Sequence, residues 1–175
     1  YSEEKLDRNL FGWEMPAAWV QSINPVFIII FAGVMAALWT RLGRKQPGSA
    51  LKFSIGLFVM GLAFLAFIPL AGEGKTPLLA LVGILLLFTL AELFLSPIGL
   101  SVTTKLAPKA FHTQMVALFF LSVSLGTTLA GMLSGLYNPD DELPYFIGVG
   151  GTAMLLAVGL AAASPAIKKL MGGVR

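Results

Sequence analysis

Long apolar runs separated by short polar segments make up most of this chain of 175 residues. Each run approaches or exceeds the roughly 20 residues that an α-helix needs to cross a bilayer. The pattern predicts an all-α, polytopic membrane protein, with a transmembrane bundle over 16–171 between a polar extracellular segment at 1–15 and a cytoplasmic tail at 172–175. The five transmembrane helices are predicted at about 17–40, 53–71, 78–104, 113–137 and 144–167.

The distribution of charge predicts how these spans are oriented. Most of the 12 Lys and Arg residues lie at one set of alternating span ends: Arg41, Arg44, Lys45, Lys52, Lys105, Lys109, Lys168, Lys169 and Arg175. The opposite ends hold Lys5, Arg8 and Lys75, together with every acidic residue except Glu92. Because cytoplasmic loops carry the excess of Lys and Arg, the C-terminus is predicted in the cytoplasm and the N-terminal segment outside an inner (plasma) membrane.

Composition narrows the functional class. Apolar residues make up 57% of the chain and charged residues only 12%, which is typical of membrane proteins. No cysteine is present, and the lone His112 has no companion ligand, so neither a metal site nor a cofactor is expected. The basic residues flank helices, so they do not indicate nucleic-acid binding. The sequence offers no nucleophile–base pair, so it does not indicate an enzyme. A start at Tyr1 without an initiator methionine predicts a fragment or a processed piece.

Glu92 is the one ionisable residue inside a long apolar run. A carboxylate at membrane depth costs about 2.5 kcal/mol or more on insertion scales, so such a residue indicates a functional site by default. Three roles fit it: a proton carrier, an anchor for a cationic group of a ligand, and a hydrogen-bond partner between helices, which is worth about 1 kcal/mol.

Two further polar positions accompany prolines. Ser96 follows Glu92 by one helical turn on the same face, and Pro97 is expected to kink or break the helix there. The irregular backbone predicts a helix that lines a cavity. Asn24 precedes Pro25, where its side chain either caps a helix opening or contacts a ligand.

The fourth predicted span carries small and aromatic residues. Gly131 and Gly135 have the GxxxG spacing, which predicts close helix packing. Taken alone, the adjacent pair Phe119 and Phe120 is more typical of packing than of a binding pocket.

Several sequence blocks together resemble the proton-dependent oligopeptide transporters, the POT or PTR family of the major facilitator superfamily. The blocks are DRN at 7–9, FGWEMP at 11–16, QSINP at 21–25, AELFLSPIGLS at 91–101 and TKLAP at 104–108. Their order and spacing cover nearly the whole chain. The resemblance implies that the five spans are helices 8 to 12 of a twelve-helix fold, part of its C-terminal six-helix bundle. The N-terminal half and helix 7 of the transporter would then be the partners of this chain.

The resemblance also implies a function and assigns roles to particular residues. The expected activity is proton-coupled import of di- and tripeptides by alternating access, with protons as the coupling ion. Glu92 matches the residue that engages the peptide amino terminus, Asn24 contacts the peptide nearby, and Ser96 lies close. Phe119 and Phe120 match an aromatic pair beside a side-chain pocket, although the family often has Trp at the first position.

Pro97 is expected to be a pivot of the inner gate. Two alternative functions stay open at this point. One is a major facilitator transporter of another substrate, such as nitrate, a drug or a lipid. The other is a structural membrane subunit built from a truncated transporter.

Overall fold

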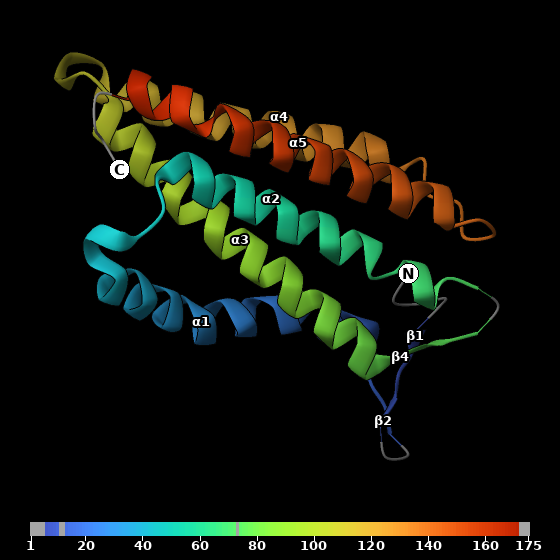
Figure 1. Cartoon of the computed structure of the whole chain (residues 1–175). Coiled ribbons are helices and arrows are strands. Elements are labelled where there is room, and N and C mark those ends of the chain that lie inside the picture. Colours follow the sequence, from blue (N-terminus) through green and yellow to red (C-terminus); the bar gives the residue numbers. More distant parts are fainter. Residues whose placement is uncertain (1–5, 11–12, 73, 172–175) are drawn as a thin grey trace.

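Five long helices form the structure of this chain, a computed structural model that describes residues 6–10, 13–72 and 74–171 (Figure 1). They are α1 (Ala17–Leu42), α2 (Ser49–Leu65), α3 (Leu78–Leu106), α4 (His112–Ser134) and α5 (Leu143–Leu170). Each is part of a segment long and apolar enough to cross a membrane, which confirms the predicted all-α class. The predicted tail at 172–175 and the first five residues of the predicted N-terminal segment lie outside the described residues.

Short elements connect the helices. The 3₁₀ helices are η1 (Gly43–Lys45), η2 (Ile68–Leu70) and η3 (Lys109–Phe111), and the strands are β1 (Leu6–Asp7), β2 (Asn9–Leu10), β3 (Trp13–Glu14) and β4 (Thr76–Pro77). β2 and β3 form an antiparallel hairpin. β1 pairs in parallel with β4, with Leu6 opposite Thr76, so the segment before α1 is tied to the start of α3.

Helix α2 lies between α3 and α5 and packs closely against both (Figure 1). Helix α3 also contacts α1 and, over a shorter stretch, α4. The buried Ser54 hydroxyl of α2 donates a hydrogen bond to the Ala157 carbonyl of α5 at 2.7 Å. No residue of α4 is buried within this chain. The chain therefore has a tight centre of α2, α3 and α5, flanked by α1 and α4.

The largest cluster of buried side chains joins the ends of several helices near β1 and β4. Phe67 stacks on Phe146 with ring centroids 4.6 Å apart and planes 7° from parallel. The remaining buried members are Leu6, Val20, Ala63, Leu78, Leu81 and Ile84. Because Leu6 belongs to β1, the N-terminal segment contributes to this core as well as to the strand pairing.

Close helix packing is made by different glycines from those expected. A Cβ built on Gly150 of α5 would lie 2.9 Å from Leu65 Cγ and 3.1 Å from the Gly61 carbonyl oxygen of α2. Gly131 and Gly135 make no such contact within this chain: a Cβ on Gly131 would meet nothing within 4 Å, and one on Gly135 only its own neighbour Met132. The close packing predicted for these two glycines stays a prediction.

The prolines do not break their helices. α3 continues through Pro97, and α1 continues through Pro25. The expected helix opening at Asn24 is therefore wrong. Of the kink or break expected at Pro97, the break is wrong and the kink stays a prediction. A proline removes only one hydrogen bond of the ladder, and unwinding a helix would expose many more backbone groups to the apolar surroundings.

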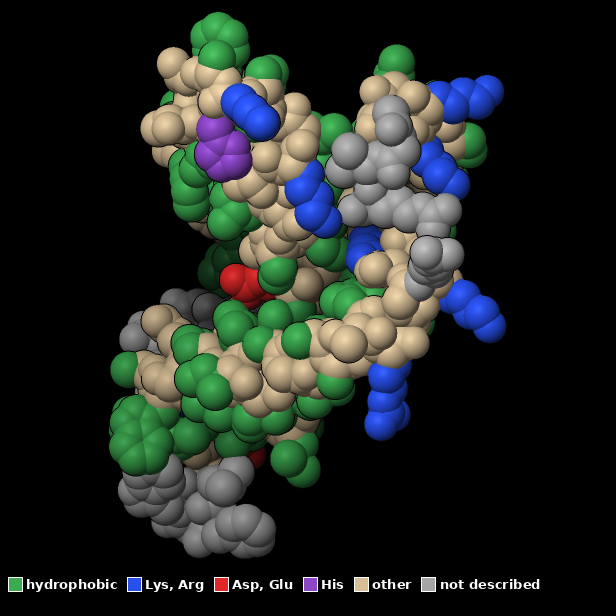
Figure 2. All heavy atoms as spheres, turned by 90° about the vertical axis from the view of Figure 1, so that its left-hand side faces the viewer, with side chains coloured by type: hydrophobic (Ala, Val, Ile, Leu, Met, Phe, Trp, Pro, Cys, Tyr) green, Lys and Arg blue, Asp and Glu red, His purple; other side chains and the backbone are tan. Residues whose placement is uncertain are grey.

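One end of the molecule gathers Lys and Arg side chains around a hollowed face (Figure 2). Lys52, which directly precedes the span predicted at 53–71, lies in the first turns of α2 with only 8% of its surface exposed. Its ammonium donates to Gln46 Oε1 at 2.6 Å and lies 4.2 Å from the centre of the Trp39 ring. The long apolar stem is thus covered while the charge keeps polar and aromatic contacts.

Replacing Gly150 with alanine should destabilise the protein by about 1–3 kcal/mol, the usual cost of overpacking. The added methyl would collide with Leu65 and with the backbone of Gly61. Gly159→Ala is the matched control on the same helix, because a Cβ there meets nothing within 4 Å. Thermal unfolding of the purified protein in detergent should show a lower Tm for Gly150→Ala alone, and equal Tm values for both variants would contradict the close α2–α5 contact.

Candidate functional site

A cavity of about 810 Å³ lies beside Glu92, within the size range of small-molecule pockets. Four helices line it: Asn24 of α1; Leu57 and Met60 of α2; Leu85, Phe88, Glu92, Leu95 and Ser96 of α3; and Val123, Gly126 and Thr127 of α4. Most of this wall is apolar, and the polar groups are few. Such a wall orients a ligand through a small number of directed contacts.

Three polar side chains of α1 and α3 form a connected network at this wall. Asn24 Nδ2 donates to Glu92 Oε2 at 3.3 Å. The Thr89 hydroxyl lies 2.5 Å from Asn24 Oδ1 and 2.8 Å from the carbonyl oxygen of Leu85. Thr89 is completely buried, whereas Asn24 and Glu92 are half-buried. The carboxylate therefore reaches the cavity while its partner is fixed from behind.

The helical repeat brings these residues together. Leu85, Thr89, Glu92 and Ser96 follow one another at intervals of three or four positions, so they lie along one face of α3. That face is turned toward α1, where Asn24 lies near the beginning of the helix. An amide suits this position because it both donates and accepts hydrogen bonds.

The chemistry of the network follows from its charges. Among the described residues that line the cavity, Glu92 is the only ionisable one. An amide can stabilise an ionised carboxylate through its N–H group, but it supplies no countercharge. The site can therefore take a cationic group or a proton at Glu92, which keeps both functional roles proposed for this residue available.

The structure brings three of the predicted site residues into one cavity: Asn24, Glu92 and Ser96. The next residue, Pro97, lines a different cavity of about 450 Å³. Trp39, Lys52 and Lys105 also line that second cavity. The consecutive residues Ser96 and Pro97 of α3 therefore line two different cavities.

The two predicted aromatic residues lie away from Glu92. A Cβ built on Gly99 of α3 would approach the Phe119 ring to 2.7 Å and the Phe53 ring to 3.1 Å, so Gly99 provides the space into which Phe119 packs. Phe120 is 57% exposed and contacts Phe119 edge to face, with centroids 5.6 Å apart. Neither residue lines the cavity at Glu92, and their role beside a substrate pocket stays a prediction.

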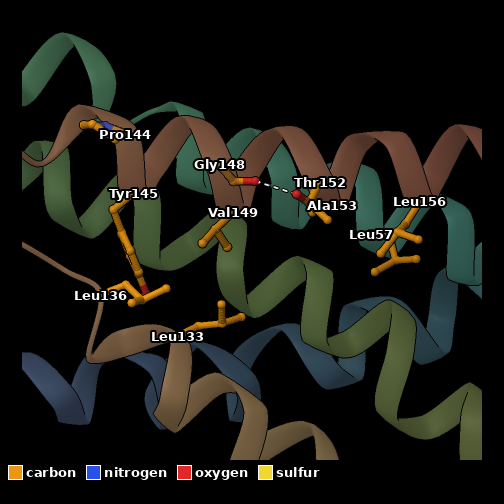
Figure 3. A pocket seen from close by; sticks show the side chains of 10 residues that line it. All are labelled: Leu57, Leu133, Leu136, Pro144, Tyr145, Gly148, Val149, Thr152, Ala153 and Leu156. Atoms are coloured by element: carbon orange, nitrogen blue, oxygen red, sulfur yellow. Dashed lines mark hydrogen bonds between the residues drawn. The ribbon is translucent and has the colours of Figure 1, made fainter.

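A further cavity of about 580 Å³ lies between α2, α4 and α5 and is shown in Figure 3. Its wall is mostly apolar, including Leu57, Leu133, Leu136 and Leu156. The Thr152 hydroxyl at this wall donates back to the Gly148 carbonyl at 2.7 Å, the bond drawn in Figure 3. The cavity at Glu92, which combines a carboxylate with an amide, is therefore the candidate site.

Sequence reasoning missed Thr89. A threonine in a membrane helix is common, because its hydroxyl can bond to the carbonyl four residues earlier, and Thr103 and Thr104 do so in the same helix. The available signal was its position three residues before Glu92, which places both side chains on one face. Only the position of Asn24 shows that Thr89 has a second contact.

The family model for the POT family matches residues 1–148, which is most of the chain. The chain belongs to the POT family. This confirms the resemblance carried by the blocks around Asn24 and Glu92. It also places the chain in a family of transporters and not among enzymes.

Known relatives of this POT family chain are longer than it is. An uncharacterized transporter, YclF, of Bacillus subtilis (strain 168) is 41% identical over 177 residues, 99% of this chain and 36% of the relative. A di-/tripeptide transporter of Lactococcus lactis subsp. lactis (strain IL1403) is 33% identical, again over 99% of this chain and 36% of the relative. The chain thus spans about a third of the length of the curated relatives it matches.

Solved structures show the same helix arrangement. The crystal structure of a mutant of peptide transporter POT in complex with alafosfalin superimposes with a TM-score of 0.91 at 40% sequence identity. The match covers 98% of this chain and 36% of the other. The five helices are therefore arranged as part of a POT transporter.

Replacing Asn24 with alanine should lower the stability of the protein by roughly 0.6–1.7 kcal/mol, the range for hydrogen bonds between membrane helices. Glu92 and Thr89 would lose the amide that joins α1 to α3. Gln21→Ala, at an exposed position of the same helix, is the control. Thermal unfolding in detergent measures the difference, and an Asn24→Ala protein as stable as the control would show that the network does not hold the helices.

Proposed function

We propose that this chain is part of a proton-coupled symporter that imports di- and tripeptides. In this proposal Glu92 binds the peptide ammonium group, and Asn24 and Ser96 supply hydrogen bonds beside it. The observation that carries the proposal is a carboxylate that faces a cavity, with an uncharged amide as its hydrogen-bond partner. None of the described residues that line this cavity offers a positive charge that would compete with an incoming cation.

The substrate class follows from chemistry and from relatives. An ammonium group is the cation that every unmodified peptide carries at its amino terminus, and it donates three hydrogen bonds. A carboxylate and a serine hydroxyl oxygen are suitable acceptors for them. The Lactococcus relative, named a di-/tripeptide transporter, supports peptides of this length as the substrate.

The orientation proposed for the membrane places the C-terminus in the cytoplasm and the segment before α1 outside. Its support is the gathering of Lys and Arg side chains at one end of the helices (Figure 2). The acidic residues Asp140, Asp141 and Glu142 lie in or beside the loop between α4 and α5, at the opposite ends of these helices. This distribution agrees with the excess of Lys and Arg found in cytoplasmic loops.

Transport by alternating access needs a second half that rocks against this one. We infer that the remaining length of the transporter, including helix 7 and the N-terminal half, closes the cavity at Glu92 and supplies the rest of the peptide and proton sites. The five helices then provide the wall that recognises the amino terminus. A transporter of nitrate, which is an anion, or a structural subunit would not require an ammonium anchor. Competition by dipeptides separates a peptide transporter from a transporter of drugs or lipids.

Glu92→Gln in the complete transporter should weaken binding of a dipeptide roughly 10- to 100-fold. Losing a charge-assisted hydrogen bond costs about 1.5–3 kcal/mol, which corresponds to a loss of affinity of this size. Binding of the same dipeptide with an acetylated amino terminus should be weak in both proteins. Direct binding and competition for uptake by unlabelled dipeptides measure these effects.

The matched control is Asp140→Asn, which removes a carboxylate from an exposed position between α4 and α5. Its dipeptide affinity should equal that of the unmodified protein. If Glu92→Gln also bound and transported dipeptides normally, the anchor role would be wrong. If dipeptides failed to compete with any transported substrate of the unmodified protein, the peptide assignment itself would be wrong.

We also propose Pro97 as a pivot of the inner gate. Pro97→Ala restores a backbone N–H opposite the Leu93 carbonyl and should stiffen α3 where it passes between two cavities. The expected result is a lower maximal transport rate with unchanged dipeptide affinity. Pro165→Ala, also inside a helix, is the control. An unchanged rate for Pro97→Ala would remove the pivot role.

A further inference from the structure

The hydroxyl of Thr89 has two acceptors within reach and only one proton to donate. Asn24 Oδ1 lies at 2.5 Å and the Leu85 carbonyl oxygen at 2.8 Å. Thr89 is fully buried, so water does not share its hydrogen bonds. A hydroxyl donates one hydrogen bond and can accept others, so at any moment one of these two contacts lacks the Thr89 proton.

We infer that Thr89 is a positioning residue. It determines whether the nitrogen or the oxygen of the Asn24 amide faces Glu92. This inference rests on the proposed role of Glu92 as the ammonium anchor. When Thr89 donates to Asn24 Oδ1, the amide oxygen points away from the carboxylate and Nδ2 points toward it, as the structure shows. An ionised carboxylate only accepts hydrogen bonds, so this is the orientation that an ionised Glu92 requires.

The distances support this orientation. The separation of 2.5 Å between Thr89 Oγ1 and Asn24 Oδ1 belongs to the range of O–H···O bonds, 2.5–3.0 Å, and is shorter than usual N–H···O bonds. An amide nitrogen in place of Oδ1 would need about 2.7 Å or more. Without the Thr89 hydroxyl, the Asn24 amide fits its site in either orientation. The reversed orientation would place Oδ1 against the Glu92 carboxylate.

A second arrangement satisfies every group only when Glu92 carries a proton. Thr89 then donates to Leu85, its oxygen accepts from a reversed Asn24 amide, and Asn24 Oδ1 accepts the proton of Glu92. The orientation of Asn24 is therefore linked to the protonation of Glu92 through Thr89. The described residues of α1, α2 and α4 that line the cavity contain no other ionisable side chain that would compete for this proton.

The test compares three threonine variants of the complete transporter by dipeptide affinity, by its pH profile and by Tm. Thr89→Val keeps the shape and loses the hydroxyl, and Thr89→Ser keeps the hydroxyl. Thr103→Val is the control on the same helix, where the hydroxyl donates to the Gly99 carbonyl. Thr89→Val should bind a dipeptide roughly tenfold more weakly, because binding would then include the cost of turning the Asn24 amide; tenfold corresponds to about 1.4 kcal/mol. Thr89→Ser should stay within about twofold of the unmodified protein, and Thr103→Val should be unchanged.

Two further readings separate positioning from packing. Thr89→Val combined with Asn24→Ala should bind no more weakly than Asn24→Ala alone, because the hydroxyl acts through the amide. The pH profile of dipeptide binding should change for Thr89→Val and stay unchanged for Thr89→Ser. Additive losses of affinity with an unaltered pH profile would overturn the inference.

A parallel measurement with Glu92→Gln separates this inference from the proposed function. If Glu92→Gln loses dipeptide binding while Thr89→Val retains it, the positioning role fails and the ammonium anchor stands. If Glu92→Gln binds as tightly as the unmodified protein, the anchor role fails first, and the role of Thr89 fails with it.

Discussion

A carboxylate among apolar helices needs a hydrogen-bond partner, and the placement of α1 against α3 meets that requirement. Glu92 obtains the partner from α1 through Asn24, whose other end is held by Thr89 of α3. The bond is polar, directional and shared by two helices. It fixes the rotation of α1 about its own axis more strictly than contacts between apolar side chains do, since those contacts have no direction.

The remaining helices differ in how tightly they are held. α2 and α5 approach closely through Gly61 and Gly150, and Ser54 adds a buried hydrogen bond to the Ala157 carbonyl. α1 and α4 have large exposed apolar surfaces, including Ile29 at 78% and Met132 at 67%. The cavity at Glu92 has walls from both kinds of helix.

The roles of α3 also explain its composition. Its apolar length crosses the membrane, one face carries Thr89, Glu92 and Ser96, and Gly99 makes room for the ring of Phe119. Pro97 lies directly after Ser96 but lines another cavity. One helix therefore crosses the membrane, lines the cavity at Glu92 and provides the surface against which Phe119 of α4 packs.

The sequence by itself determined the five apolar helices and the family, and it singled out Glu92 as a candidate site residue. Helix length, charge at the helix ends and an ionisable residue in an apolar run are local properties, which do not depend on how the helices meet. Only the tertiary structure decided which side chains are hydrogen-bond partners and which helices pack together. From the sequence alone, Asn24 fits the role of a helix cap as well as that of a ligand contact, and only the packing of α1 against α3 distinguishes them. Thr89 fits the common pattern of a hydroxyl that donates to the carbonyl four residues earlier, and only the position of Asn24 adds its second contact. The glycines differ in the same way, because a GxxxG spacing allows close approach but does not select the neighbour. Which surfaces meet depends on distances between helices far apart in the sequence, and the spacing within one helix carries no information about them.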